Sequence, residues 1–179
     1  LVRGANDNAS GVAVMMELAS LLSGENAGCN YLFIAFGMEE WGCVGSEYFM
    51  DNIPGNTGEI KGMINLDMVG GMAGDTLMLW HARSAREWPA YIKEANTAGL
   101  KLDLLAEESS PSDSETVRRA GIPTLFLYTG PDSFDHGKEI ELLNYEGMNS
   151  ILNFSYKLIR SISSREKRLT CHGKREPGR

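Results

Sequence analysis

Five residues of this 179-residue chain are candidates for divalent-metal chemistry by their type and their position: Asp7, Glu39, Glu40, Asp67 and His136. Adjacent carboxylates such as Glu39 and Glu40 repel each other, and they are costly to desolvate unless a cation or another partner compensates. Carboxylate oxygens together with an imidazole nitrogen form a ligand set that suits zinc or a similar divalent ion. The residue types therefore predict a metal centre.

Each of these residues taken alone also has an ordinary structural explanation. Glu39 and Glu40 could be two solvated loop residues, and Asp67 could be a cap or part of a loop salt bridge. Asp7 precedes a predicted helix and could be its N-cap, and His136 could be a surface histidine. The metal interpretation gains from the set as a whole, because two bound cations would supply about four positive charges and reverse the repulsion among the acids.

The elements that must position these residues alternate between helices and apolar strands. Strands are predicted over 30–36, 60–68, 76–80 and 122–128. Helices are predicted over 8–22, 45–50, 84–97, 114–120 and 144–163. The expected fold class is therefore α/β with a mixed or mostly parallel sheet. In such sheets functional residues lie on loops beyond the carboxyl ends of the strands, which is where Glu39-Glu40, Asp67 and His136 fall.

Composition excludes several classes of protein. The apolar fraction of 42% and charged fraction of 23% are ordinary for a globular domain, and no apolar run reaches the roughly 18 residues of a membrane span. The net charge of −7 argues against nucleic acid as the main partner. Residues 164–179 are basic and lack apolar periodicity, so we expect a domain over 1–163 and a disordered tail. Cys29, Cys43 and Cys171 are too scattered for a disulfide framework or a CxxC metal site.

Six segments resemble the di-zinc exopeptidase family, which includes bacterial leucyl aminopeptidases, aminopeptidase Y, glutamate carboxypeptidase and glutaminyl cyclase. The segments are GANDNASG (residues 4–11), FGMEEWGCVGS (36–46), INLDMVG (64–70), AGIPT (120–124), TGP (129–131) and NYEGM (144–148). The first two are specific, and the others add weight by their position. The resemblance covers roughly residues 3 to 160 and implies a three-layer sandwich fold.

The resemblance also implies a role for each candidate residue. Asp7 resembles the carboxylate that bridges two zinc ions, Glu40 a ligand of one zinc, and Asp67 a ligand of the other. His136 resembles the imidazole that shares the zinc of Glu40, and Glu39 resembles the general base. The implied activity is hydrolysis of the N-terminal peptide bond of a peptide substrate, and the implied location is secreted or periplasmic. The oligomeric state stays open.

The chain also departs from the family pattern. The family's first zinc ligand is a histidine upstream of the GANDNASG segment, and neither His81 nor His172 stands at that position. We therefore expect one zinc to bind weakly and the early strands of the sheet to be missing, which would expose an apolar edge. The family's Ser-Asp-His reads Ser-Asp-Ser at residues 112–114. Trp41 is either a pocket wall or core, and the bond between Asp7 and Asn8 is expected to be cis.

Two alternative functions remain open at this point. The first is a binding domain on the same scaffold without catalysis, which the absence of the upstream histidine favours and the presence of Glu39 and Glu40 opposes. The second is an acyltransferase that resembles glutaminyl cyclase and uses one zinc. The Asp7 motif and the Glu39-Glu40 pair favour hydrolysis over that second alternative.

Overall fold

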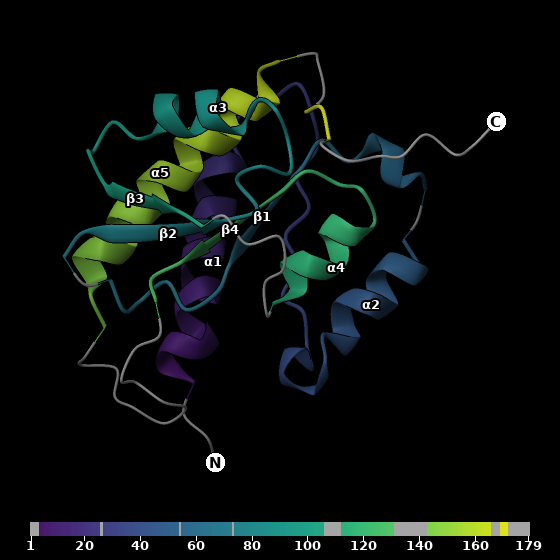
Figure 1. Ribbon diagram of the computed structural model, residues 1–179, viewed down its shortest axis with the longest axis horizontal. Coiled ribbons are helices and arrows are strands. Elements are labelled where there is room, and N and C mark those ends of the chain that lie inside the picture. Colours follow the sequence, from purple (N-terminus) through teal and green to yellow (C-terminus); the bar gives the residue numbers. More distant parts are fainter. Residues whose placement is uncertain are drawn as a thin grey trace.

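A mixed four-stranded sheet forms the middle layer of the computed structural model (Figure 1). The structure describes residues 4–25, 27–53, 55–72, 74–105, 112–130, 143–165 and 169–171. In spatial order the strands are β1 (Met63–Leu66), β4 (Thr124–Tyr128), β2 (Thr76–Trp80) and β3 (Lys101–Leu104). The pairs β1–β4 and β2–β3 are parallel, and β2–β4 is antiparallel. The predicted α/β class with a mixed, mostly parallel sheet is confirmed.

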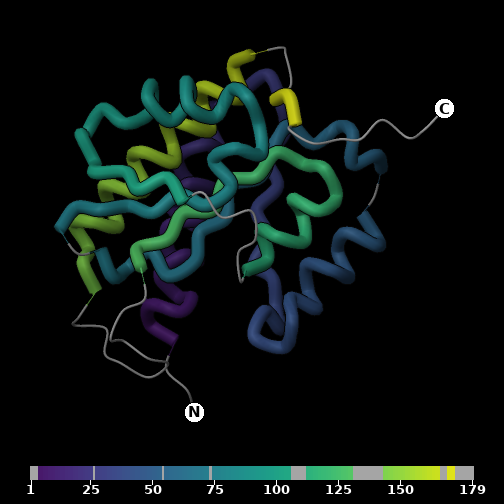
Figure 2. Tube along the Cα trace, in the orientation of Figure 1, coloured from purple at the N-terminus to yellow at the C-terminus, as the bar shows by residue number. Residues whose placement is uncertain are grey.

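Helices cover both faces of this sheet. One layer contains α1 (Gly11–Leu22), α3 (Trp88–Ala95) and α5 (Tyr145–Ser163), in which α5 packs against both α1 and α3. The other layer contains α2 (Val44–Asp51) and α4 (Asp113–Arg119), which pack together, and α4 contacts β1 and β4. Figure 2 shows how the purple α1 and the yellow-green α5, from opposite ends of the sequence, lie side by side. Three short turns complete the elements: η1 (Ala5–Ser10), η2 (Glu39–Trp41) and η3 (Thr57–Glu59).

The apolar pattern of the chain explains this layering. β4 is a central strand with helices on both faces, so Thr124 to Leu127 are all buried. The buried apolar residues of α5 recur three or four positions apart, which places them on one face of the helix. They are Met148, Ile151, Phe154 and Leu158.

Two parts of the sheet differ from the sequence prediction. The predicted strand over 30–36 is wrong, because none of the described residues pairs with it; Leu32 is 72% exposed and Phe33 is 38% exposed. An extended apolar segment becomes a strand only where a neighbour supplies hydrogen-bond partners. Conversely, β3 was not predicted. Its residues are mostly exposed, and it exists because Thr76 to Leu79 pair with Lys101 to Leu104.

Part of the predicted tail packs against the body of the molecule. Leu169 is buried, Thr170 donates hydrogen bonds from its backbone and side chain to Glu87, and Cys171 forms a β-bridge with Ala85. For these three residues the expectation of disorder is corrected, because Leu169 joins the apolar core. The remaining tail residues beyond Arg165 lie outside the described part. None of the helices that the structure describes has the length and hydropathy that crossing a bilayer requires.

Candidate metal centre

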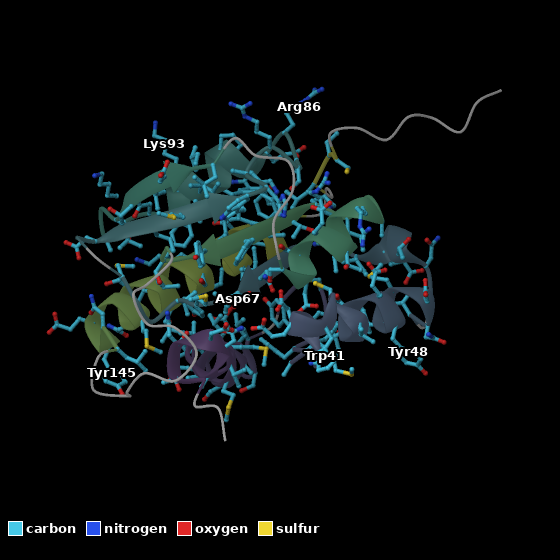
Figure 3. All side chains as sticks on the ribbon, turned by 60° about the horizontal axis from the view of Figure 1, so that its bottom comes forward. Trp41, Tyr48, Asp67, Arg86, Lys93 and Tyr145 are labelled. Atoms are coloured by element: carbon cyan, nitrogen blue, oxygen red, sulfur yellow. The ribbon has the colours of Figure 1, made fainter. Side chains whose placement is uncertain are left out.

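Three separate elements present the four acidic residues of the predicted centre. Asp7 lies in η1, directly ahead of α1. Glu39 and Glu40 open η2, and Asp67 follows the last residue of β1. In Figure 3 Asp67 lies in the middle of the molecule, near the ends of α1 and α2. The bond between Asp7 and Asn8 is cis, as the family resemblance implied.

The turn that carries Glu39 and Glu40 is enclosed by left-handed residues. Met38 before it has φ 60°, and Gly42 after it has φ 91°. The backbone N–H groups of Gly42 and Cys43 both donate to the carbonyl oxygen of Glu39, over 2.9 and 2.8 Å. A non-glycine residue in the left-handed region stores strain, and such residues gather at functional sites. This local backbone holds Glu39 half-buried while Glu40 is exposed.

The electrostatics show that the acids influence one another. Burial, followed by the charges of Asp67, Glu40, Asp113 and Asp7, raises the pKa of Glu39 to about 7. Burial also raises the pKa of Asp67 to about 6, against the lowering effect of a hydrogen bond from Ser112, and Asp7, Asp113 and Glu40 raise it further. A group of carboxylates that disfavours its own ionisation is stabilised by a cation placed among them. The donor set is thus chemically suited to a divalent ion.

Asp113 is an acid of this cluster that the sequence analysis did not assign to the site. It is 7% exposed, burial raises its pKa, and its Oδ1 has no hydrogen-bond partner among the described residues. Its charge acts on both Glu39 and Asp67. The sequence signal for Asp113 is its place in Ser112-Asp113-Ser114, the segment that departs from the family's Ser-Asp-His.

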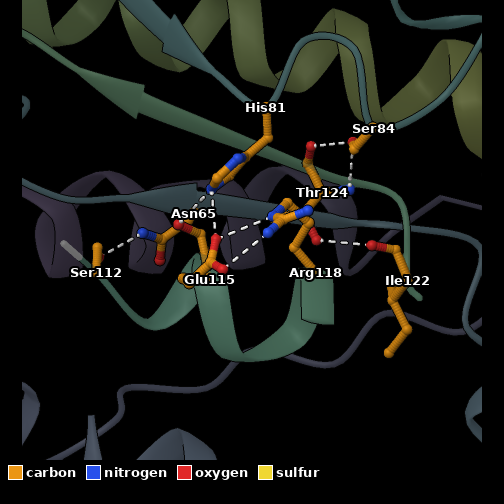
Figure 4. Close-up of polar contacts among 9 residues, drawn as sticks. Asn65, His81, Ser84, Ser112, Glu115, Arg118, Ile122 and Thr124 are labelled. Atoms are coloured by element: carbon orange, nitrogen blue, oxygen red, sulfur yellow. Dashed lines mark hydrogen bonds and ion pairs between the residues drawn. The ribbon is translucent and has the colours of Figure 1, made fainter. Parts of the chain in front are cut away.

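His81 contacts two residues of α4 that follow Asp113 in the chain. Its ring lies 3.4 Å from Ser114 Oγ and 3.9 Å from Glu115 Oε2, and Glu115 in turn pairs with Arg118 (Figure 4). Burial, together with the charge of Arg118, lowers the pKa of His81 to about 4, against the opposing effect of Glu115. The sequence analysis did not place His81 among the predicted ligands, and that assignment stays a prediction.

The structure describes only part of the predicted ligand set. His136 lies in 131–142, outside the described residues. Within the described part, no three His, Cys, Asp or Glu side chains are arranged to hold a metal ion. Asp7, Glu40 and Asp67 nevertheless all act electrostatically on Glu39. The roles of these four residues as zinc ligands or as the general base stay predictions.

Trp41 lies at the surface beside this cluster. It is 81% exposed, and Tyr48 on α2 is 69% exposed; Figure 3 shows both at the outer face of this part of the molecule. The interpretation of Trp41 as core is therefore wrong. A large exposed aromatic residue next to Glu40 is compatible with a wall of a binding site.

Sequence comparisons match this chain to a protein family and to individual relatives. Residues 2–151 match the model of Peptidase family M28. Aminopeptidase YwaD of Bacillus subtilis is 44% identical over 138 residues, which are 73% of this chain and 30% of the relative. A probable zinc metalloprotease of Leptosphaeria maculans is 32% identical over 111 residues, or 61% of this chain and 26% of the relative.

Solved structures of known proteins share the fold of this chain. BSAP, a zinc aminopeptidase from Bacillus subtilis, superimposes with a TM-score of 0.78 at 25% identity, over 92% of this chain and 44% of that one. A Porphyromonas gingivalis glutaminyl cyclase shares the fold with a TM-score of 0.66 at 19% identity, over 88% and 63% of the two chains. The chain spans less than a third of the length of the curated relatives above and under half of BSAP. On its sequence match and its fold, this chain belongs to Peptidase family M28.

Proposed function

We propose that this chain forms the catalytic core of a zinc-dependent exopeptidase that hydrolyses the N-terminal peptide bond of peptides. The observation that carries the proposal is the half-buried position of Glu39 among Asp67, Glu40, Asp113 and Asp7, whose charges all act on it. A carboxyl group held beside candidate metal ligands is placed to act as a general base. The names of two relatives, an aminopeptidase and a zinc metalloprotease, support the same reaction class.

Asp7, Glu40, Asp67 and His136 would hold the zinc, which when bound lowers the pKa of its water toward about 7 and polarises the scissile carbonyl. Glu39 accepts the proton of the attacking water and returns it to the departing amine, so one carboxyl serves first as base and then as acid. The two backbone hydrogen bonds to the carbonyl oxygen of Glu39 hold the backbone from which its side chain projects. Glu40, its exposed neighbour, is assigned to metal binding, so the two adjacent carboxyls divide the work.

The test is a hydrolysis assay with zinc titrated against a chelator. Leucine p-nitroanilide is the substrate, and its N-acetylated form is the blocked control. Glu39→Gln removes the base, and Glu17→Gln removes an exposed acid of α1 as a matched control. We expect the wild type to cleave only the free-amine substrate, and Glu39→Gln to lose about 10²–10⁴-fold in kcat while Glu17→Gln stays unchanged.

Two outcomes would contradict the proposal in different ways. A protein that binds zinc but hydrolyses neither substrate, with Glu39→Gln indistinguishable from the wild type, would favour a binding domain. Release of ammonia from an N-terminal glutaminyl peptide, without hydrolysis of the anilide, would favour the glutaminyl-cyclase-like acyltransferase. The zinc stoichiometry also tests the expectation that one of two ions binds more weakly.

A further inference from the structure

Asn8 contacts both chain neighbours of Asp67. Its Nδ2 donates to the carbonyl oxygen of Leu66 over 2.9 Å, and its Oδ1 accepts from the backbone N–H of Met68 over 3.3 Å. The same Oδ1 accepts from the N–H of Gly11 over 3.1 Å, at the first residue of α1. One amide side chain, adjacent in sequence to Asp7, therefore ties the loop of Asp7 to the segment that carries Asp67.

Asn6 and Ser10 extend this attachment along the same segment. Ser10 Oγ accepts from the N–H of Val69 over 3.1 Å, and Asn6 Oδ1 accepts from the N–H of Gly70 over 2.8 Å. Asn6 and Ser10 are 5% and 1% exposed, and Ser10 also donates to the carbonyl of Asn6 over 2.6 Å. Asn6, Asn8 and Ser10 thus each accept a hydrogen bond from one of the three consecutive backbone N–H groups of residues 68–70. Asp7 lies in the sequence between Asn6 and Asn8.

The segments 6–11 and 66–70 approach so closely that neither Gly11 nor Gly70 has room for a side chain. A Cβ at Gly11 would lie 2.3 Å from the carbonyl oxygen of Leu66 and 2.4 Å from Asn8 Oδ1. A Cβ at Gly70 would lie 2.8 Å from Asn6 Oδ1. Buried and part-buried hydrogen bonds from Asn6, Asn8 and Ser10 therefore hold the two backbones at a fixed spacing.

We propose that Asn8 is a positioning residue that sets the separation of the Asp7 and Asp67 carboxylates and thereby the zinc affinity of the centre. The inference rests on the proposed function, since it assumes that these two acids bind zinc. Only a side chain with both a donor and an acceptor satisfies Leu66 and Met68 at once, which is what the amide of asparagine offers. Residues that orient metal ligands typically change metal affinity by about 10–100-fold when they are replaced.

The test compares Asn8→Leu, which is nearly isosteric and makes no hydrogen bond, with Asn8→Ala. The matched control is Asn153→Ala, which removes an exposed amide of α5 that donates within its own helix, to the carbonyl of Asn149. Zinc dissociation constants are measured by competition with a chromophoric chelator, with zinc alone as ligand. Circular dichroism of the zinc-free proteins reports whether each variant is folded.

We expect both Asn8 variants to be folded and to bind zinc about 10–100-fold more weakly than the wild type, with Asn153→Ala within twofold. Folded Asn8 variants with wild-type zinc affinity would overturn the inference. So would loss of folding in both variants, because Asn8 would then support the fold in general. A wild type that binds no zinc would instead overturn the proposed function, so the two failures are distinguishable.

Discussion

The hydroxyl of Ser112 donates a hydrogen bond to Oδ2 of Asp67 over 2.8 Å. Ser112 immediately precedes α4, whereas Asp67 follows β1, so this bond links a helix of one outer layer to the end of a strand. The side-chain amide of Asn65 donates to the same hydroxyl over 2.8 Å (Figure 4). Because the hydroxyl already accepts from Asn65, its one proton is directed at Asp67, which stabilises the ionised carboxylate.

Ser112→Ala should raise the pKa of Asp67 above its present value of about 6, because the bond from Ser112 favours the charged form. We expect the zinc-free variant to lose about 1–3 kcal/mol of unfolding free energy at pH 8. The loss should be smaller at pH 4, where Asp67 is protonated. Urea unfolding at the two pH values measures this, with Ser150→Ala on α5 as the control. An equal loss at both pH values would show that the bond does not depend on the charge of Asp67.

Asp67→Asn should stabilise the zinc-free protein at neutral pH. Burial raises the folded-state pKa of Asp67 from 3.8 to about 6, so the folded chain holds the proton more tightly than the unfolded chain. The stability that comes from this proton is present below about pH 4 and is lost as the pH rises through 6. Asparagine mimics the protonated form, so we expect no difference near pH 4 and a gain of about 1–2 kcal/mol at pH 8, after discounting for screening.

His81 changes the unfolding free energy with pH in the direction opposite to Asp67, and comparing Asp67→Asn with the wild type removes this contribution of His81. Its pKa is lowered from 6.5 to about 4, so its contribution is present above pH 6.5 and lost as the pH falls through 4. It is common to the wild type and to Asp67→Asn, so it cancels in the difference between their unfolding free energies. Urea unfolding in the presence of a chelator gives that difference, and a destabilised Asp67→Asn at pH 8 would contradict the prediction.

Zinc should stabilise the folded chain, and its removal should reverse the effect. At zinc 100-fold above the dissociation constant the gain is about 2.7 kcal/mol, which corresponds to about 5–10 °C in Tm for a chain of this size. The double variant Asp7→Asn/Asp67→Asn should lose the shift. Glu17→Gln/Glu146→Gln, which makes the same change in charge at two exposed sites, should keep it. Thermal melts with zinc and with a chelator measure the shift, and an equal shift in both double variants would mean that zinc binds elsewhere.

Replacing Trp41 or Trp88 by alanine should have very different effects on the unfolding free energy. Trp41 is 81% exposed, so Trp41→Ala should change the unfolding free energy by less than about 0.5 kcal/mol. Trp88 is fully buried and donates from its indole nitrogen to Ser84 Oγ, so Trp88→Ala should cost about 3–5 kcal/mol. Urea denaturation of the two variants provides the comparison. A loss of more than about 2 kcal/mol in Trp41→Ala would indicate that Trp41 packs against the fold.

Local pattern predicted the elements that bury apolar side chains. The strand over 76–80 and the long helix near 144–163 agree with β2 and α5, because their apolar spacing is set by burial. β3 could not be predicted in this way, since its exposed residues form a strand only by pairing with β2. The stretch 30–36 failed for the converse reason, because an apolar run does not reveal whether a partner strand exists.

The candidate site shows the same division. Position beside predicted strands and helices, together with the resemblance of the segments 4–11, 36–46 and 64–70, selected Asp7, Glu39, Glu40 and Asp67 as candidates. The fold brings these four acids within electrostatic reach of one another. Asp113 was missed as a member of the cluster, because its burial against the sheet comes from the packing of α4. The bonds of Asn8 were also missed, since they join residues about 60 positions apart in the chain, a separation that local periodicity does not report.

Anomalous diffraction at the zinc edge, from crystals grown with zinc, tests the central claim most directly. The account predicts zinc within about 2.0–2.2 Å of carboxylate oxygens of Asp7, Glu40 and Asp67 and of a ring nitrogen of His136, with Glu39 nearby but not coordinated. Zinc bound away from these four residues, or bound directly by Glu39 in place of Glu40, would contradict it.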